Sequence, residues 1–357
     1  DLSSVCGETI GSWEPIANYP LDDSPKEGFK GDFNGNNYKI KSIYINSTQE
    51  YSQGLFGVNY GSIKNVHISS GVIKNEALSC GGIVATNYSI VENCSNNASV
   101  TGVRAVGGIV GSNLKIIRKC YNTGSITGNN RVGGIVGDHS NGGTDTGAEL
   151  YDCYNTGEVK CSGFWGGGIA GVNYNDCIIE NSYNVGKVIN DNGDSKTIFG
   201  VVGDNFSKVT NCYYLENSAS AGMGKGDVYG QVEVRTEAYM KTNGFVENLG
   251  TTNWKIVDGL NNGYPVLSWE EGTAISGRYN AYFFYGILGG QGNVDDKKTV
   301  TIKPGACQYG PYVTLTPGKY QIRYVGDNFN SIESSQYQVR SIYSEEGTEI
   351  PEETWPI

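Results

Sequence analysis

One short sequence pattern recurs along this chain, and this recurrence restricts the fold more than any other feature. A clear copy is "GGIVGSNLKIIRKCYNTGSITG", residues 107–128, which begins with two glycines and carries one cysteine in its middle. Aligned on that cysteine, Cys120, the copies follow one another at intervals of 26 to 33 residues. A repeat of this length is typical of stacked units that bury their apolar residues only against one another.

Each copy places apolar residues at fixed distances from a central position. The central positions are Val66, Cys94, Cys120, Cys153, Ser182 and Cys212. Three residues earlier stand Ile63, Val91, Ile117, Leu150, Ile179 and Val209, and six residues later stand Val72, Val100, Ile126, Val159 and Val188. Apolar residues three apart cannot share one face of a regular strand, so the chain must bend or bulge between Ile117 and Cys120. The pattern therefore predicts three short strands per copy, joined by corners.

Stacked in parallel, six copies would form a rod on the order of 30 Å long. The sequence thus predicts an all-β protein, a right-handed parallel β-helix with its first coils in residues 1–53 and six repeat coils in 54–217. Equivalent residues would form columns along this rod. Asn122, Asn155 and Asn184 are expected to form an outer or corner ladder of hydrogen bonds.

The cysteines are predicted to be mostly free thiols. Cys94, Cys120, Cys153 and Cys212 share one column, where a thiol packs as a small apolar group. The C-x-x-C spacing of a zinc or redox site does not occur in the sequence. The other cysteines lie off this column, and a disulfide among them remains open: Cys6, Cys80, Cys161, Cys177 and Cys307.

The pattern resembles the repeat of the GLUG-motif family, in "GGIVGSN" followed by "KCYNTGSITG". "SWEPIAN", "FKGDFNGNNYKIKSIYIN" and "GLFG" are similar to the first coils of such proteins, and "TNWKI" with "NNGYPVLSW" to their closing segment. The resemblance covers roughly residues 1–270. It implies a secreted or surface-anchored bacterial protein, as are adhesins and the non-catalytic parts of immunoglobulin A-cleaving metallopeptidases. It also implies further domains on both sides of this segment.

The remaining segments are predicted to cap and extend the rod. Residues 218–270 would form its C-terminal cap, with a short helix that starts at Thr236 and aromatic residues that pack on the last coil. Residues 271–344 alternate apolar and polar residues and contain the turn "LTPGKY", which predicts an antiparallel β-sandwich. Residues 345–357 are predicted to be an acidic linker.

Composition excludes several classes of partner. The chain has 26 Lys and Arg against 37 Asp and Glu, a formal net charge of −11, so most of its surface would repel nucleic acid. Its sequence has no apolar run near the ~20 residues of a membrane span, so we expect no membrane insertion in this segment.

Catalytic patterns are also missing from the sequence. It has 2 histidines, His67 and His139, and neither belongs to an H-E-x-x-H motif. His67 is expected to point outward, and His139 to lie in an insertion. We assign no catalytic residue and expect no enzyme, and a polysaccharide lyase or hydrolase of the β-helix type is the less favoured alternative.

Corners of variable length between coils are the predicted binding site. Counted from the apolar anchors, the following residues fall on one edge of the rod: Arg104, Arg131, Phe164, Trp165, Asp191 and Asp194. Aromatic faces with fixed charged groups suit a sugar or a peptide. The alternative is structural, with Trp165 folded over Cys161 to close a longer corner.

A structural calcium ion is a second expectation. The loops "DHSNGGTDTG" and "NDNGDS" place oxygen ligands beside glycines, as hard-cation loops do. The ligands would come from Asp138, Asp145, Asp191 and Asp194; no other cofactor is expected. The sequence as a whole favours an adhesin-like stalk that binds a glycan or a host protein, and a passive spacer is the alternative.

Overall fold

The computed structural model describes residues 1–17, 28–48, 52–76, 78–143, 146–193, 197–224 and 230–270, and four short strands beyond them. The chain divides into two compact units, Asp1–Thr273 and Ala274–Ile357. In the second unit, β33 (Gly292–Val294) pairs antiparallel with β34 (Val300–Ile302), and β35 (Tyr337–Val339) with β36 (Glu353–Trp355). The predicted β-sandwich and acidic linker otherwise lie outside the described residues.

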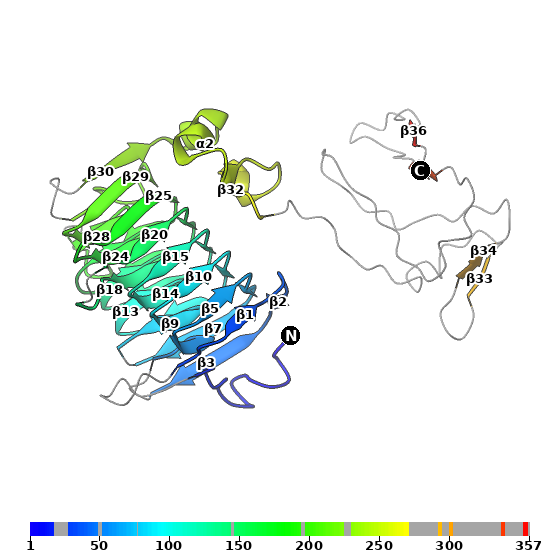
Figure 1. Ribbon diagram of the computed structural model, residues 1–357, viewed down its shortest axis with the longest axis horizontal. Coiled ribbons are helices and arrows are strands. Elements are labelled where there is room, and N and C mark those ends of the chain that lie inside the picture. The colour runs from blue at the N-terminus through cyan, green and yellow to red at the C-terminus, as the bar shows by residue number, and fades with distance from the viewer. Residues whose placement is uncertain are drawn as a thin grey trace. The chain divides into compact units, whose positions relative to one another are not determined.

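The first unit is a parallel β-solenoid, which Figure 1 shows as coils stacked from blue to green. Its turns pass through four sheets in a fixed order. One turn consists of β10 (Ile90–Glu92) and β11 (Ser95–Asn96) in sheet 1, β12 (Ser99–Thr101) in sheet 2, β13 (Arg104–Gly107) in sheet 3 and β14 (Val110–Asn113) in sheet 4. Each turn therefore has five short strands where the sequence pattern predicted three.

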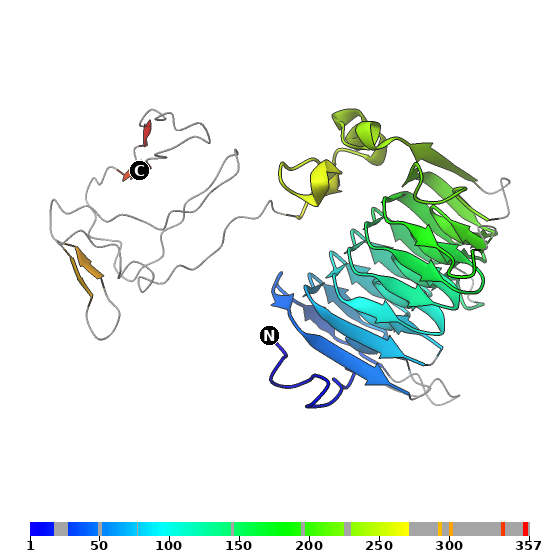
Figure 2. The same ribbon diagram turned by 180° about the vertical axis from the view of Figure 1, so that it is seen from behind.

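The other coils repeat this order in register, as the view from behind also shows (Figure 2). Sheet 1 also contains β1 (Asp32–Asn34), β2 (Lys39–Ile40), β5 (Ser62–Lys64), β6 (His67–Ile68), β15 (Ile116–Arg118), β16 (Tyr121–Asn122), β20 (Glu149–Tyr151), β21 (Tyr154–Asn155), β25 (Ile178–Asn184), β29 (Lys208–Leu215) and β30 (Gly230–Arg235). Sheet 2 also contains β3 (Ile43–Ser47), β7 (Gly71–Asn75), β17 (Ile126–Gly128), β22 (Val159–Cys161) and β26 (Val188–Ile189). Sheet 3 also contains β8 (Cys80–Gly81), β18 (Asn130–Gly133), β23 (Gly166–Gly167) and β27 (Ile198–Phe199). Sheet 4 also contains β4 (Phe56–Asn59), β9 (Val84–Asn87), β19 (Val136–His139), β24 (Ala170–Asn173) and β28 (Val202–Asn205).

The predicted bend before the central cysteine is confirmed. Lys119 has a φ of 53°, and the equivalent Asn93 and Asn181 have 52° and 48°. A left-handed residue here turns the chain, so Ile117 and Cys120 both point into the core. Asparagine adopts this conformation more readily than most residues, which accounts for its frequency at this position.

The core columns follow the repeat. The central cysteines are buried, and all eight cysteines in the described part of the chain are free thiols. Ile73, not Val72, pairs with Val100 in sheet 2, and Val72 is 43% exposed. The prediction for Val72 was wrong because this coil has one more residue before the anchor than the other coils.

The asparagine ladder exists, but it lies inside the solenoid. Asn96, Asn122, Asn155 and Asn184 are all fully buried. The side-chain amide of Asn122 donates to Asn155 Oδ1 at 2.8 Å and to the carbonyl of Gly124 at 2.8 Å, and its Oδ1 accepts from Asn96 at 3.0 Å. Because the amide in each coil is hydrogen-bonded to the amide in the next coil, these side chains can be buried without a net loss of hydrogen bonds.

Glycines opposite this ladder make room for it. A Cβ on Gly108 would lie 2.4 Å from Asn122 Cγ, and one on Gly134 would lie 2.4 Å from Asn155 Cγ. Real Cβ atoms do not approach so closely, so each buried amide requires a glycine across the turn. This contact accounts for the second glycine of the repeated "GG".

A second buried ladder runs along sheet 4 and contains a histidine. Asn113 Nδ2 lies 3.1 Å from His139 Nδ1, and His139 Nε2 lies 3.2 Å from the carbonyl of Ile178. Burial lowers the pKa of His139 to about 4, so the ring is neutral, with Nδ1 accepting and Nε2 donating. His139 is thus a rung of the core, not part of an insertion. Its neighbour Asn173 Oδ1 is buried and has no hydrogen-bond partner among the described residues.

Residues Thr236–Glu270, which we call the strap, lie along the side of the coils (Figure 1). The strap contains α1 (Glu237–Met240), capped by Thr236 as predicted, α2 (Asn243–Leu249), β31 (Trp254–Lys255), the 3-10 turn Asn261–Gly263 and β32 (Val266–Leu267). It covers a column of tyrosines on sheet 1, of which the first three stack on one another: Tyr121, Tyr154, Tyr183 and Tyr213. The end of the last coil is covered by β30, so the strap does more than cap the rod.

The end of the strap is held by buried polar groups. Both carboxylate oxygens of Glu270 accept from the hydroxyl of Tyr154, at 3.1 and 3.0 Å, and Oε1 accepts from the amide of Leu267. Trp269 stacks on His67 at 5.0 Å. His67 points away from the solenoid core, as predicted, but Trp269 covers it, so it is buried. Its two ring nitrogens contact Ser95 and Asn37.

We expect His139→Asn to stabilise the protein. An amide at this rung can accept from Asn113 and donate to the unpaired Oδ1 of Asn173, so the free energy of unfolding should rise by about 1–2 kcal/mol. Urea unfolding followed by circular dichroism measures the change. His67→Asn is the matched control and should lower stability, because it removes the stack on Trp269. Equal losses for both variants would contradict the role given to His139.

The stability of the strap should depend on pH through Glu270. Burial raises the pKa of this carboxyl from its ordinary value of 4.5 to about 7. Because the folded state holds this proton more tightly, its contribution is full below pH 4.5 and is lost as pH rises through 7, an effect on the order of 3 kcal/mol.

Wild type and Glu270→Gln should be compared by urea unfolding from pH 4.5 to 8.5. Since both proteins share every other titrating group, the difference between their curves isolates Glu270, and the stability of the wild type should fall more steeply as pH rises. Parallel curves would show that Glu270 is not buried in this way.

Candidate ligand-binding edge

The corner between sheet 2 and sheet 3 carries the predicted edge. Its equivalent residues in three successive coils are Ala105, Arg131 and Trp165, with φ of 49°, 54° and 67°. Strands of sheet 4 pack closely against these residues. A Cβ on Gly171 in β24 would lie 2.4 Å from the carbonyl carbon of Arg131, and one on Gly203 in β28 would lie 2.4 Å from that of Trp165. Main chain therefore packs on main chain here, and this contact fixes the backbone positions from which the side chains of Arg131 and Trp165 extend.

Arg131 lies at the centre of a partly buried network. Its guanidinium forms an ion pair with Asp138, and its Cζ lies 5.5 Å from the ring centre of Trp165 and 6.0 Å from that of Tyr174. The two side chains of the ion pair are 20% and 13% exposed. A cation between two aromatic rings is stabilised by both, so Arg131 holds Trp165 in place.

Tyr174 and Asp204 complete this network, and the sequence reasoning missed both. The hydroxyl of Tyr174 donates to Asp204 Oδ2, and burial, followed by this bond, raises the pKa of Tyr174. Tyr174 also lies 5.4 Å from Phe206. A signal existed, because the residue after the sheet 4 ladder is aromatic in several coils: Tyr60, Tyr88, Tyr174 and Phe206.

Phe164 is the most exposed aromatic residue of this edge. Its side chain is 60% exposed, and its amide donates to Asn130 Oδ1 at 3.1 Å. Arg104 is exposed and pairs in register with Asn130, so Arg104, Asn130 and Phe164 occupy three successive rungs. Gly163 allows this close approach, because a Cβ there would lie 2.6 Å from Asn129 Oδ1.

The loop after β26 is attached to the same corner. Asn190 Nδ2 donates to the carbonyl of Gly163 at 3.3 Å, and Asn192 Nδ2 to that of Ser162 at 2.7 Å. Asp191, between them, is exposed. The structure thus brings Asp191 near Phe164, whereas Asp194 lies outside the described residues. The edge has an exposed part around Phe164 and a buried part around Arg131.

The calcium site stays a prediction. Asp138 is engaged by Arg131, and Asp145 and Asp194 lie outside the described residues. Within the ranges that the structure describes, no group of three or more His, Cys, Asp or Glu residues could hold a metal ion.

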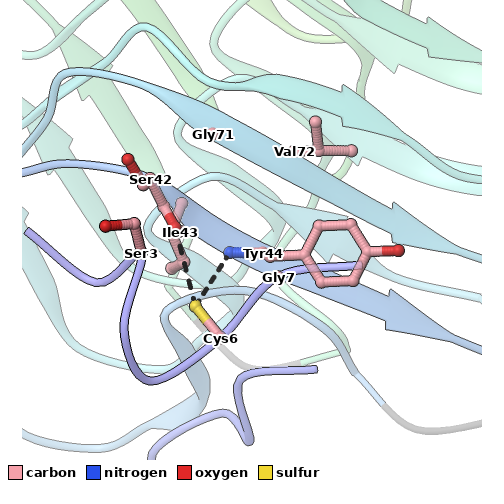
Figure 3. Close-up of a pocket in the computed structure, with 8 residues that line it drawn as sticks. All are labelled: Ser3, Cys6, Gly7, Ser42, Ile43, Tyr44, Gly71 and Val72. Atoms are coloured by element: carbon pink, nitrogen blue, oxygen red, sulfur yellow. Dashed lines mark hydrogen bonds between the residues drawn. The ribbon is translucent and has the colours of Figure 1, made fainter. Parts of the chain in front are cut away.

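A shallow depression of about 270 Å³ lies beside β3 at the first coil (Figure 3). Cys6 fastens the N-terminal loop there: Tyr44 N donates to its Sγ at 3.3 Å, and the thiol lies 3.6 Å from the carbonyl of Ser42. The described residues that line it include no charged side chain, and the depression is open to solvent, so it would bury little of a ligand. The Phe164 edge remains the better candidate.

The model of the GLUG motif matches residues 102–127, which span one turn of the solenoid. This turn carries a GLUG motif. The matched turn pairs in register with the coils on both sides, so the neighbouring coils share its structure.

Two known proteins are similar to this chain. A candidate Gly-rich membrane protein of Evansella cellulosilytica is 31% identical over 99 residues, which are 27% of this chain and span only 11% of that relative. The crystal structure of a candidate immunoglobulin A1 protease from Bacteroides ovatus aligns with a TM-score of 0.41 and 20% identity, over 66% of this chain and 87% of that one. In the described part of our chain, no helix is long and apolar enough to cross a membrane.

We expect Arg131 and Asp138 to be strongly coupled. Removing either partner leaves a charge that is mostly buried and unpaired, so Arg131→Ala and Asp138→Ala should each cost about 1–3 kcal/mol of unfolding free energy. The double variant should cost clearly less than the sum. The exposed pair of Lys160 and Glu158, 3.4 Å apart, is the control and should show a coupling of about 0–1 kcal/mol. Similar coupling in both pairs would contradict the buried position of Arg131.

Proposed function

We propose that this GLUG solenoid is a non-enzymatic, extracellular bacterial protein that acts as an adhesin-like stalk and presents a ligand-binding edge. The observation that carries the proposal is the 60% exposed ring of Phe164, which stands on a corner held by the Arg131 network. An exposed aromatic ring on a rigid support offers binding area at a low cost in conformational entropy.

The repeat itself supports the role of a stalk. Each coil contacts mainly its neighbours, so the rod can be extended without changing its cross-section. The corners can then vary without disturbing the core, because they lie outside the buried columns. The ligand is a glycan or a host protein, and the surface location agrees with the types of protein that the GLUG resemblance implies.

An array of glycans and host matrix proteins tests the proposal. The chain should bind at least one of them, and Trp165→Ala should weaken that binding because the ring supports the corner that carries Phe164. Tyr38→Ala is a matched control: Tyr38 is 78% exposed but belongs to the first coil. The melting temperature of each variant separates loss of binding from loss of fold.

Two results would contradict this function. Binding to no glycan or protein would favour the passive spacer. Release of reducing ends or unsaturated uronates from an array polysaccharide would favour an enzyme.

A further inference from the structure

We infer that the Phe164 edge recognises a neutral glycan, an inference that rests on the proposed function and specifies its ligand. The edge is defined by Arg104, Asn130, Phe164 and the loop Asn190–Gly193. The charges of these residues disfavour an acidic ligand, their strand pairing disfavours an extended peptide, and their side chains fit a sugar. A neutral glycan satisfies all three conditions.

Charge disfavours an acidic glycan. Among the described residues of the edge, the exposed charges are one base, Arg104, and one acid, Asp191. The guanidinium of Arg131 is already neutralised by Asp138, and both side chains are largely buried. The edge therefore has no surplus of cations to offset a polyanion, and the net charge of −11 on the whole chain repels one further.

Strand pairing disfavours an extended peptide. A peptide that binds a sheet gains most from adding a strand to a free edge. At this corner, β18 pairs with β13 and β23, and β23 pairs with β18 and β27, so their main-chain groups are already used within the solenoid. A peptide would have only side chains to bind.

The side chains fit a sugar without charge. The ring of Phe164 is exposed, and the apolar face of a pyranose can pack on it. The amide of Asn130 lies on the next rung, and Asn129 is exposed beside it. Amides both donate and accept, so they match the hydroxyl groups of a sugar in either role.

The support beneath the ring reduces the cost of binding. Phe164 is fixed through its amide to Asn130, and the loop is fixed by Asn190 and Asn192. Because these groups are already ordered, the ligand does not have to order them. The edge is thus a preorganised surface for a neutral polysaccharide.

The test titrates the full chain with neutral polysaccharides (mannan, β-glucan and xylan) and with acidic ones (hyaluronate, polygalacturonate and heparin), at low and high NaCl. We expect at least one neutral polysaccharide to bind, with an affinity that salt leaves unchanged. Phe164→Ala should weaken this binding about threefold to tenfold, the range for loss of an aromatic contact. Tyr38→Ala, which removes an aromatic ring that is 78% exposed on the first coil, should leave the affinity unchanged.

The outcomes separate the two proposals. Binding of acidic polysaccharides only, weakened by salt, would overturn the neutral ligand but keep the proposed function. A host protein as the only ligand would do the same. Equal losses for Phe164→Ala and Tyr38→Ala would place the site elsewhere and overturn the inference. The absence of any ligand would overturn both proposals.

Discussion

The solenoid depends on one contact, in which a buried asparagine amide packs against a glycine across the turn. The amide of Asn122 bonds to its own coil through Gly124 and to both neighbouring coils through Asn96 and Asn155. Each coil is narrow enough that this side chain reaches Gly108 on the opposite wall. A buried amide without partners would cost about 1–3 kcal/mol, so the ladder fixes the register of every coil against the next. A shift of one coil by one residue against its neighbour would leave several amides without hydrogen-bond partners.

The strap shows how the outside of the rod is stabilised. The tyrosines of sheet 1 stack with the same spacing as the coils, and without the strap they would form a long apolar stripe. Trp254, Phe245 and Trp269 cover this stripe and connect coils that are distant in the sequence. The side chain of Asp152 accepts from Asn253 and from the indole of Trp254, and burial raises the pKa of this carboxyl. The strap is therefore held by an apolar face, with polar bonds at its middle and at its C-terminal end.

The sequence predicted the features that repeat. The column of Cys94 and Cys120 and the bend before it followed from spacing alone, because apolar residues three apart permit few backbone paths. The depth of the asparagine ladder did not follow, since Asn122 and Gly108 are far apart in the sequence and meet only when the turn closes. His139 could have been placed: "GGIVGDH" aligns with "GGIVGSN", and this puts the histidine at the ladder position of Asn113. The path of the strap could not be predicted, because its sequence contains no repeat.

The candidate site, like the fold, could be predicted from the sequence only in part. Corner length pointed to Arg131, Phe164 and Trp165, because a longer corner must project from a coil of fixed cross-section. Tyr174 was missed because it follows the sheet 4 strand of the next coil, far in sequence from Arg131, and only the packing of sheet 4 on sheet 3 brings its ring to 6.0 Å from Arg131 Cζ. Core columns are used by every coil and must stay apolar or paired, so they cannot distinguish one ligand from another. Residues at a corner need not be apolar or paired, so a substitution there costs little stability. Ligand specificity in a solenoid of this kind therefore belongs to its corners, and Phe164 occupies one that is anchored by both adjoining coils.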